Sequence, residues 1–143
     1  MHFMPAPPKA AATTLLAACG LPTEDLTELH FQHFLGFWNE TELVGVAGVE
    51  LYGAAGLLRS VAVAEHVRSA GYGKRLIREA ELYAAREGVR ELYLLTSTAC
   101  SLFGSLGYVV HSRDAAPYAI KKTKEFSAIC PASAVFMSKR LAF

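Results

Sequence analysis

The sequence has little cysteine, little net charge and no long apolar run, and each absence excludes a class of protein. Only three of its 143 residues are cysteine, and none of them stands in a Cys-x-x-Cys pair: Cys19, Cys100 and Cys130. This odd number and this spacing favour neither a disulfide framework nor a zinc site. We therefore expect a reducing, cytoplasmic setting and no bound metal. Metalloid ligation by the three thiols is the weaker alternative, because a lone cysteine among apolar neighbours is usually a small core residue.

The charge is nearly balanced, with 14 Lys and Arg against 13 Asp and Glu and a formal net charge of +1. Nucleic-acid binding usually needs a broad basic footprint, which no stretch of this chain supplies. We expect a small-molecule partner and no nucleic acid.

The longest apolar stretches fall short of the roughly 20 residues that a membrane span needs, so no membrane partner is expected. The run from Lys9 to Cys19 has some likeness to a short export segment that ends in a lipid-attachment cysteine. Thr13 and Thr14 interrupt that run, and we expect it to form the first helix instead.

Length and apolar content predict one compact α/β domain over residues 1–143, since 52% of the residues are hydrophobic. In the first half, Pro7 or Pro8 opens a helix that runs through Ala18 and ends at Gly20, and Thr23 caps a second short turn. Alternating and apolar runs then predict an antiparallel meander of three strands, over residues 34–38, 43–52 and 57–64.

The second half begins with a strand-helix-strand unit. Helical spacing of apolar residues continues until Gly88, and the nearly continuous apolar run 92–95 is typical of a strand covered on both faces. A short helix over 99–106 and strands over 108–111 and 134–138 complete the prediction. The irregular segment 112–133 between them is long enough to be functional or mobile.

The strand 57–64 leads into Arg68-x-x-Gly71-x-Gly73-Lys74 and then a helix. Successive backbone N–H groups converge at such a helix N-terminus and form an anion site, which glycines leave accessible and basic side chains reinforce. Neither of two better-known phosphate loops fits: Arg75 stands where the Walker pattern needs Ser or Thr, and Leu76 stands where the dinucleotide fingerprint needs its third Gly.

Residues 58–63, Leu-Arg-Ser-Val-Ala-Val, followed by this loop, resemble the acetyl-CoA motif of the GNAT acetyltransferases. The segment from Cys100 to Tyr108 resembles the helix and Gly-aromatic pair of that family. The tail resembles that of the arsenic-resistance N-acetyltransferases, through Arg113-Asp114, Pro117, Ile120, Glu125-Phe126, Cys130-Pro131 and Ser133-Ala134. The resemblance implies a GNAT fold of the α/β (α+β) class: a mixed central sheet with an antiparallel N-terminal meander, splayed central parallel strands and flanking helices.

The resemblance also implies where acetyl-CoA binds. Its pantetheine arm would pair with the backbone of Val61 and Val63, between the strands 57–64 and 92–96, and its pyrophosphate would lie on the glycine loop. The implied cofactor-binding residues are Val61, Ala62, Val63, Arg68, Ser69, Ala70, Gly71, Tyr72, Gly73, Lys74 and Phe103.

Two catalytic positions depart from the family pattern. Leu57 stands where some members have a glutamate base, so Glu50, His111 or an ordered water would have to accept the proton of the amine. Phe103 stands where many members have the tyrosine that protonates the departing thiolate. Tyr108, Ser97, Thr98 or a water would substitute, and Tyr108 is also readily interpreted as a packed aromatic.

Two arginines are candidates for holding the acceptor. Strand alternation places Arg59 on the face of Leu57, Val61 and Val63, near the pantetheine, where its guanidinium would grip a carboxylate through two hydrogen bonds and act in the catalytic centre. The alternative for Arg59 is a surface ion pair. Arg113 is a second clamp candidate.

The segment 112–133 is expected to fold over the substrate, with Asp114 capping a short helix near Pro117. The helix would display three lysines on a solvated face, Lys121, Lys122 and Lys124.

We therefore expect an N-acetyltransferase that acts on a small amino-acid-like amine, such as glutamate or an arsenical or phosphinic analogue, in metabolism or in resistance to arsenic or another toxin. Acetylation of protein or peptide amines is one alternative. A non-catalytic module that responds to acetyl-CoA or arsenite is another. The resemblance also allows a homodimer formed through strand edges.

Overall fold

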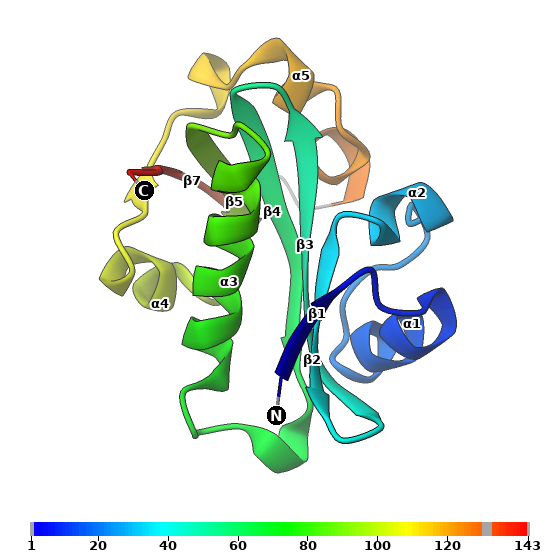
Figure 1. Ribbon diagram of the computed structural model, residues 1–143. Coiled ribbons are helices and arrows are strands. Elements are labelled where there is room, and N and C mark those ends of the chain that lie inside the picture. Colours follow the sequence, from blue (N-terminus) through cyan, green and yellow to red (C-terminus); the bar gives the residue numbers. More distant parts are fainter. Residues whose placement is uncertain (1, 130–132, 143) are drawn as a thin grey trace. The chain divides into compact units, whose positions relative to one another are not determined.

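The computed structural model describes residues 2–129 and 133–142, and its strands form one mixed sheet in the order β1-β2-β3-β4-β5-β7-β6 (Figure 1). The seven strands are β1 (His2–Pro5), β2 (Phe34–Asn39), β3 (Glu42–Tyr52), β4 (Ala55–Val63), β5 (Glu91–Thr96), β6 (Val109–Val110) and β7 (Val135–Arg140). The helices are α1 (Lys9–Ala18), α2 (Glu28–Phe31), α3 (Tyr72–Arg86), α4 (Cys100–Ser105) and α5 (Tyr118–Lys121), with shorter 3₁₀ and π turns at η1 (Glu65–Val67), η2 (Arg113–Ala115) and η3 (Glu125–Ile129).

The pairing within the sheet confirms the predicted mixed fold. β1 with β2 and β2 with β3 are antiparallel, whereas β4 and β5 are parallel, with Leu57 opposite Tyr93. The strand β1 is an addition, because the sequence pattern predicted no element before Pro7. The predicted splay of β4 and β5 stays a prediction.

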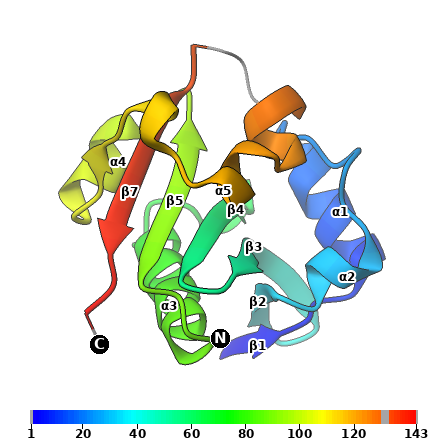
Figure 2. The same ribbon diagram turned by 90° about the horizontal axis from the view of Figure 1, so that it is seen from above.

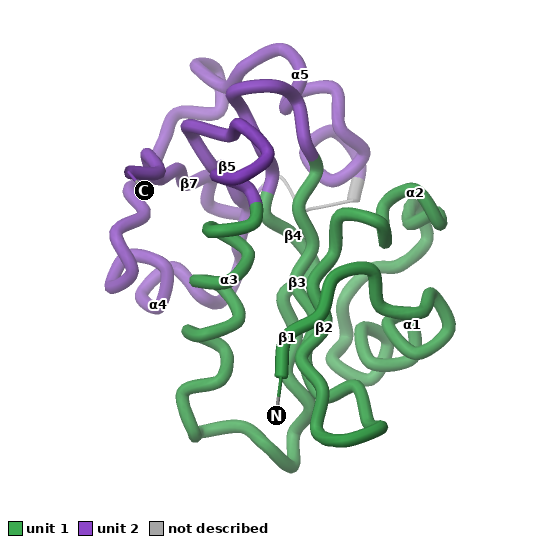
Figure 3. The backbone as a smooth tube through the Cα atoms, viewed as in Figure 1, with its two compact units in different colours: residues 1–50, 58–83 green, residues 51–57, 84–143 purple. Residues whose placement is uncertain are grey.

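The chain divides into two compact units, residues 1–50 with 58–83 and residues 51–57 with 84–143 (Figure 3). Both units contribute to β4, whose first residues belong to the second unit. The expectation of a single domain over residues 1–143 is not tested by this division and stays a prediction.

In the first unit, helices cover both faces of the sheet (Figure 2). On one face, α1 packs through Leu15 and Leu16 against a cluster that includes Val46 and Ala62. On the other face, Tyr72 of α3 lies against Phe37, with ring centroids 5.0 Å apart. As predicted, α1 begins after Pro8 and is followed by Gly20, whose φ of 74° suits a residue without a side chain.

The predicted short turn at Thr23 is present, since the Leu26 N–H donates to the Thr23 carbonyl at 3.1 Å. A short helix that the sequence did not predict, α2, follows this turn and has Thr27 as its N-cap. A capping box decides the start of α2, because Thr27 and His30 satisfy each other's polar groups at that end of the helix.

In the second unit, the segment 112–129 is mostly structured, and it covers a core of Leu57, Tyr93 and Phe136 through Ala116 and Ile120. The predicted helix near Pro117 is present as α5, with Pro117 itself at the N-cap. Asp114 does not cap it: this residue lies in η2, so that expectation is corrected.

The three lysines of the segment, Lys121, Lys122 and Lys124, are exposed as predicted. The expectations for Cys130 and Pro131 lie outside the described residues. In the part of the chain that the structure describes, no helix combines the length and apolar character of a membrane span.

Candidate functional site

The glycine loop carries a row of unused main-chain donors at the start of α3. Among the described residues, none provides a hydrogen-bond acceptor for the backbone N–H groups of residues 69–74, and the first bond of the helix is from Arg75 N–H to the Gly71 carbonyl at 3.2 Å. Ser69 and Gly71 have φ angles of 71° and 81°. Alternation of left-handed and right-handed residues makes a concave nest of N–H groups, so the loop is built to bind an anion.

Nothing inside the protein requires the residue at position 73 to be glycine. A Cβ at this position would meet only Val63 Cγ2, at 3.9 Å, and no left-handed φ is recorded for Gly73. Glycine in a helix costs about 1 kcal/mol relative to alanine. Gly73 thus leaves space beside unused N–H donors although alanine would favour the helix. This indicates that a group from outside the chain approaches the backbone there.

The two basic side chains of the loop lie differently. Lys74 is exposed, whereas Arg68 folds back onto the end of β4, where its Nε donates to the Val63 carbonyl at 2.9 Å. Its Nη2 lies 3.4 Å from Cys19 Sγ. The expectation that both side chains add positive charge beside a bound anion stays a prediction.

A bulge in β4 breaks the alternation on which the placement of Arg59 was based. Ser60 has a φ of 55°, which is unusual for a residue other than glycine. Arg59 pairs with Glu50, and Ala62 packs in the same cluster as Val46. Val46 and Glu50 are four residues apart in β3 and therefore lie on the same face of the sheet. Their neighbours in β4, Ala62 and Arg59, must share that face too, although they are three residues apart.

The opposite face of β4 carries Val63, which faces Gly73 of α3. The expectation that Arg59 shares a face with Val61 and Val63 is therefore corrected, and the cause is the additional residue that the bulge inserts.

Arg59 is also not free to grip a substrate carboxylate. Its side chain is fully buried, and its Nη1 donates to Asp25 Oδ2 at 2.5 Å and to Glu50 Oε2 at 2.8 Å. Nη2 donates to Asp25 Oδ1 at 2.9 Å, and Nε donates to Ser60 Oγ at 3.1 Å. Four of the five N–H donors of the guanidinium are thus used inside the protein. The alternative of an ion pair is correct, but the pair is buried and not on the surface.

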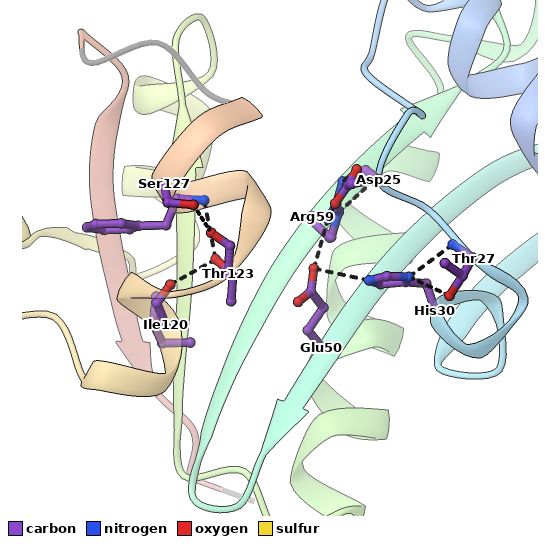
Figure 4. Close-up of polar contacts among 10 residues, drawn as sticks. Asp25, Thr27, His30, Glu50, Arg59, Ile120, Thr123 and Ser127 are labelled. Carbon is purple, nitrogen blue, oxygen red and sulfur yellow. Dashed lines mark hydrogen bonds and ion pairs between the residues drawn. The ribbon is translucent and has the colours of Figure 1, made fainter.

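Asp25 and Glu50 hold the guanidinium from two elements (Figure 4). Asp25 lies in the loop between α1 and α2, and Glu50 lies in β3. Burial acts to raise the pKa of Asp25, but the hydrogen bonds and the positive charge of Arg59 outweigh it, so this pKa lies below the ordinary value of 3.8. The carboxylate of Asp25 is therefore held ionised against the arginine.

His30 is the site residue that the sequence reading missed. Its Nε2 lies 4.0 Å from Glu50 Oε2, and its Nδ1 accepts a hydrogen bond from the backbone N–H of Thr27 at 3.0 Å. The only signal in the sequence was Thr27-x-x-His30, which has the spacing of a capping box with histidine in place of the usual Glu or Gln.

The side chains of Asp25, His30 and Glu50 have metal-ligand atoms within 4.8 Å of one another. The cation that two of them already contact is the Arg59 guanidinium.

Phe103 and Tyr108, two of the candidates in the second unit, pack on each other. Their rings meet edge to face with centroids 5.4 Å apart, and Tyr108 is 2% exposed. This environment fits the interpretation of Tyr108 as a packed aromatic.

Arg113 and His111 also make contacts inside the second unit. Arg113 donates to the Ala134 carbonyl at 2.8 Å and lies over the ring of Phe126. His111 packs edge-on against Phe136. Both residues therefore support the fold of this unit, and the clamp role of Arg113 stays a prediction.

Residues 5–108 match the family described as the acetyltransferase (GNAT) family. No curated protein sequence matches the chain. Several solved structures are similar in fold. N-acetylglutamate synthase from Neisseria gonorrhoeae, complexed with coenzyme A and N-acetyl-glutamate, superposes with a TM-score of 0.85 at 18% identity and covers 99% of this chain and 35% of its own.

Two further structures match over nearly their whole length. A putative acyl-CoA N-acyltransferase from Klebsiella pneumoniae has a TM-score of 0.77 at 24% identity and covers 99% of this chain and 97% of its own. Rv2747 from Mycobacterium tuberculosis, in complex with CoA, has a TM-score of 0.79 at 14% identity and covers 99% and 100%. The present chain spans about a third of the N-acetylglutamate synthase chains that it matches, 35% and 33%. At these identities the likeness shows the fold alone.

Proposed function

Because the chain belongs to the GNAT acetyltransferase family, we propose that it transfers the acetyl group of acetyl-CoA to the amine of a small acceptor. The observation that carries the proposal is the row of unpartnered N–H groups over residues 69–74, at the N-terminus of α3. Donors in this arrangement bind diphosphate, and acetyl-CoA carries one. The family match covers this loop and all of β4.

The loop fits the cofactor on its own geometry. The nest at Ser69 and Gly71 supplies the concave donors, and the open space beside Gly73 admits the phosphate to the backbone. Arg68 and Lys74 would add charge from the sides, and the backbone of β4 around Val61 to Val63 would pair with the pantetheine arm.

In the proposed reaction the free amine attacks the thioester carbonyl, an N–C bond forms and the C–S bond breaks. The amine loses one proton and the departing thiolate gains one. Glu50 is the carboxylate that the first unit offers for the proton of the amine, because it is 9% exposed and held in place by Arg59. Tyr108, Ser97, Thr98 and a water remain the candidates for protonating the thiolate.

The acceptor is proposed to be a small amine. Similarity to N-acetylglutamate synthase and to the arsenic-resistance enzymes supports a glutamate-like acceptor or an arsenical or phosphinic analogue of it. Because four donors of Arg59 are already used, any acidic group of the acceptor would be bound elsewhere, and Arg113 is the remaining candidate from the sequence. In the cluster of Asp25, Glu50 and Arg59 the carboxylates outnumber the guanidinium, which favours the amine end of the acceptor.

The test is an acceptor screen that measures CoA release with a thiol reagent. The panel would contain glutamate, other amino acids, phosphinic and arsenical glutamate analogues, simple amines and a peptide with a free N-terminus. Release of CoA with small amines supports the proposal. Release only with peptides, or thermal stabilisation by acetyl-CoA without turnover on any acceptor, would point to the peptide acetyltransferase or to the non-catalytic module.

A further inference from the structure

We infer that His30 is a positioning residue for Glu50, which it orients through its Nε2–H group; the inference rests on the proposed function. The His30 ring lies between Thr27 of its own helix and Glu50 of β3, and Figure 4 shows the ring aligned between them. One ring nitrogen contacts the helix cap, and the other points toward the carboxylate. The contact with Thr27 decides what the second nitrogen can do.

A backbone N–H group can only donate a hydrogen bond. The N–H of Thr27 donates to Nδ1 of His30 at 3.0 Å, and this contact requires a lone pair on Nδ1. The Thr27 hydroxyl, which also lies 3.0 Å from Nδ1, can donate to the same nitrogen. In a neutral imidazole the proton is then on Nε2, the nitrogen that lies 4.0 Å from Glu50 Oε2. The capping box therefore presents a donor to Glu50.

The same contact argues against His30 as the base that accepts the proton of the amine. Nε2 already carries a proton, and protonation at Nδ1 would break the hydrogen bond that caps α2. His30 is thus a donor with a fixed tautomer. The separation of 4.0 Å is longer than a hydrogen bond, but contacts of this kind are often long in an unliganded enzyme and tighten when the substrate is bound.

The charged groups around Glu50 come from three elements. Arg59 faces Glu50 from β4 at 2.8 Å, His30 faces it from α2, and Asp25 lies behind Arg59 in the loop before α2. Arg59 is shared between two carboxylates, so the second donor at His30 adds a contact that only Glu50 receives. The side chain of His30 is 26% exposed against 9% for Glu50, so the ring is the more exposed member of this pair.

The test uses His30→Gln. Glutamine is the usual partner at this position of a capping box, so Thr27 keeps its hydrogen bond and α2 keeps its cap, whereas the imidazole N–H toward Glu50 is lost. The control is His33→Gln, three residues further on, where the ring contacts Tyr83 OH at 2.7 Å. Both variants should unfold at nearly the same temperature as the unmodified protein.

With an active amine, His30→Gln should lower kcat/KM about tenfold or more, the effect of losing a hydrogen bond to a charged group, and leave the KM for acetyl-CoA unchanged. His33→Gln should leave kcat/KM for the amine and the KM for acetyl-CoA unchanged. A kcat/KM of His30→Gln equal to that of the unmodified protein, or an equal loss in His33→Gln, would overturn the inference.

Two NMR measurements test the role of His30 without any enzymatic turnover. The ¹⁵N shifts of His30 should identify a proton on Nε2 and a lone pair on Nδ1, and the side-chain ¹³C signal of Glu50 should change in His30→Gln and not in His33→Gln. A proton on Nδ1 with none on Nε2, or an unchanged Glu50 signal in His30→Gln, would overturn the positioning role. Absence of acetylation on every acceptor would instead refute the proposed function, and these spectra would still show whether His30 acts on Glu50.

Discussion

Arg59 Nη1 donates a hydrogen bond to Glu50 Oε2 at 2.8 Å inside the protein, with the arginine side chain fully buried. The same nitrogen also donates to Asp25. A residue that the sequence suggested as a grip for substrate is therefore an internal support for two carboxylates. Removing Arg59 would leave both buried carboxylates without their shared cation.

The first prediction concerns the stability that depends on Arg59. Arg59→Met should lower the free energy of unfolding by about 3–5 kcal/mol, because two buried carboxylates lose their shared cation. Urea unfolding of the two proteins measures this difference.

The matched control for Arg59→Met is a triple variant that adds Asp25→Asn and Glu50→Gln. With no charge left unpaired, it should recover part of the loss. If Arg59→Met alone is as stable as the unmodified protein, the cluster does not have the structural role assigned to it.

The second prediction concerns acid. The pKa of Asp25 in the folded protein lies below its ordinary value of 3.8, so its contribution to stability is complete above that value and is lost as the pH falls through the folded pKa. At neutral pH, Asp25→Asn should therefore unfold at a lower urea concentration than the unmodified protein.

This difference should narrow as the pH falls below about 3.8. Urea titrations between neutral pH and pH 3 measure it. A difference that stays constant over this range would show that Asp25 does not titrate as described.

The third prediction tests Glu50 as the proton acceptor. Glu50→Gln can still accept a hydrogen bond from Arg59 through its amide oxygen, so the protein should fold, but kcat/KM for the amine should fall by roughly 10²-fold or more. Steady-state kinetics with a saturating concentration of acetyl-CoA give the value. Glu42→Gln is the control, since Glu42 is on the same strand but 58% exposed, and its activity should be unchanged.

The fourth prediction separates cofactor binding from folding at Gly73. A Cβ at this position meets nothing closer than 3.9 Å, so Gly73→Ala should unfold at the same temperature or gain up to about 1 kcal/mol from helix propensity. Acetyl-CoA affinity should nevertheless fall, because the methyl group takes the space of the approaching phosphate. Thermal unfolding and calorimetric titration measure the two effects.

Gly71→Ala gives the contrast to Gly73→Ala. Gly71 has a φ of 81°, so its substitution should destabilise the fold as well as weaken binding. Unchanged acetyl-CoA affinity in a stable Gly73→Ala protein would contradict the assignment of the loop.

Much of the fold follows from local patterns. The apolar periodicity of residues 76–84 and the stop at Gly88 predicted α3, and the continuous apolar run 92–95 predicted β5. The Arg68 to Lys74 loop predicted an anion site from the sequence alone, because glycine, basic residues and a following helix are all adjacent there, and its binding of an anion stays a prediction. Elements and loops of this kind depend on neighbouring residues, which the sequence shows directly.

Other features of the fold could not be predicted from local sequence patterns. The start of α2 at Thr27 depends on a histidine that acts as a capping partner, which is not the usual residue there. The strand β1 is only four residues long, and its pairing with β2 depends on residues thirty or more positions away. Asp25 had no motif at all, because its role comes only from the approach of Arg59.

By itself the sequence determined most of the order of helices and strands, the family and the loop that we propose binds the anion, since these depend on short-range periodicity and on the conformational freedom of glycine. Only the tertiary structure decided what Arg59 does. The left-handed φ of Ser60 shifts the facing of the residues after it in β4, and serine gives no signal for such a conformation. Asp25, Glu50 and Arg59 then meet from three separate segments, and the geometry of that meeting is a property of the folded chain.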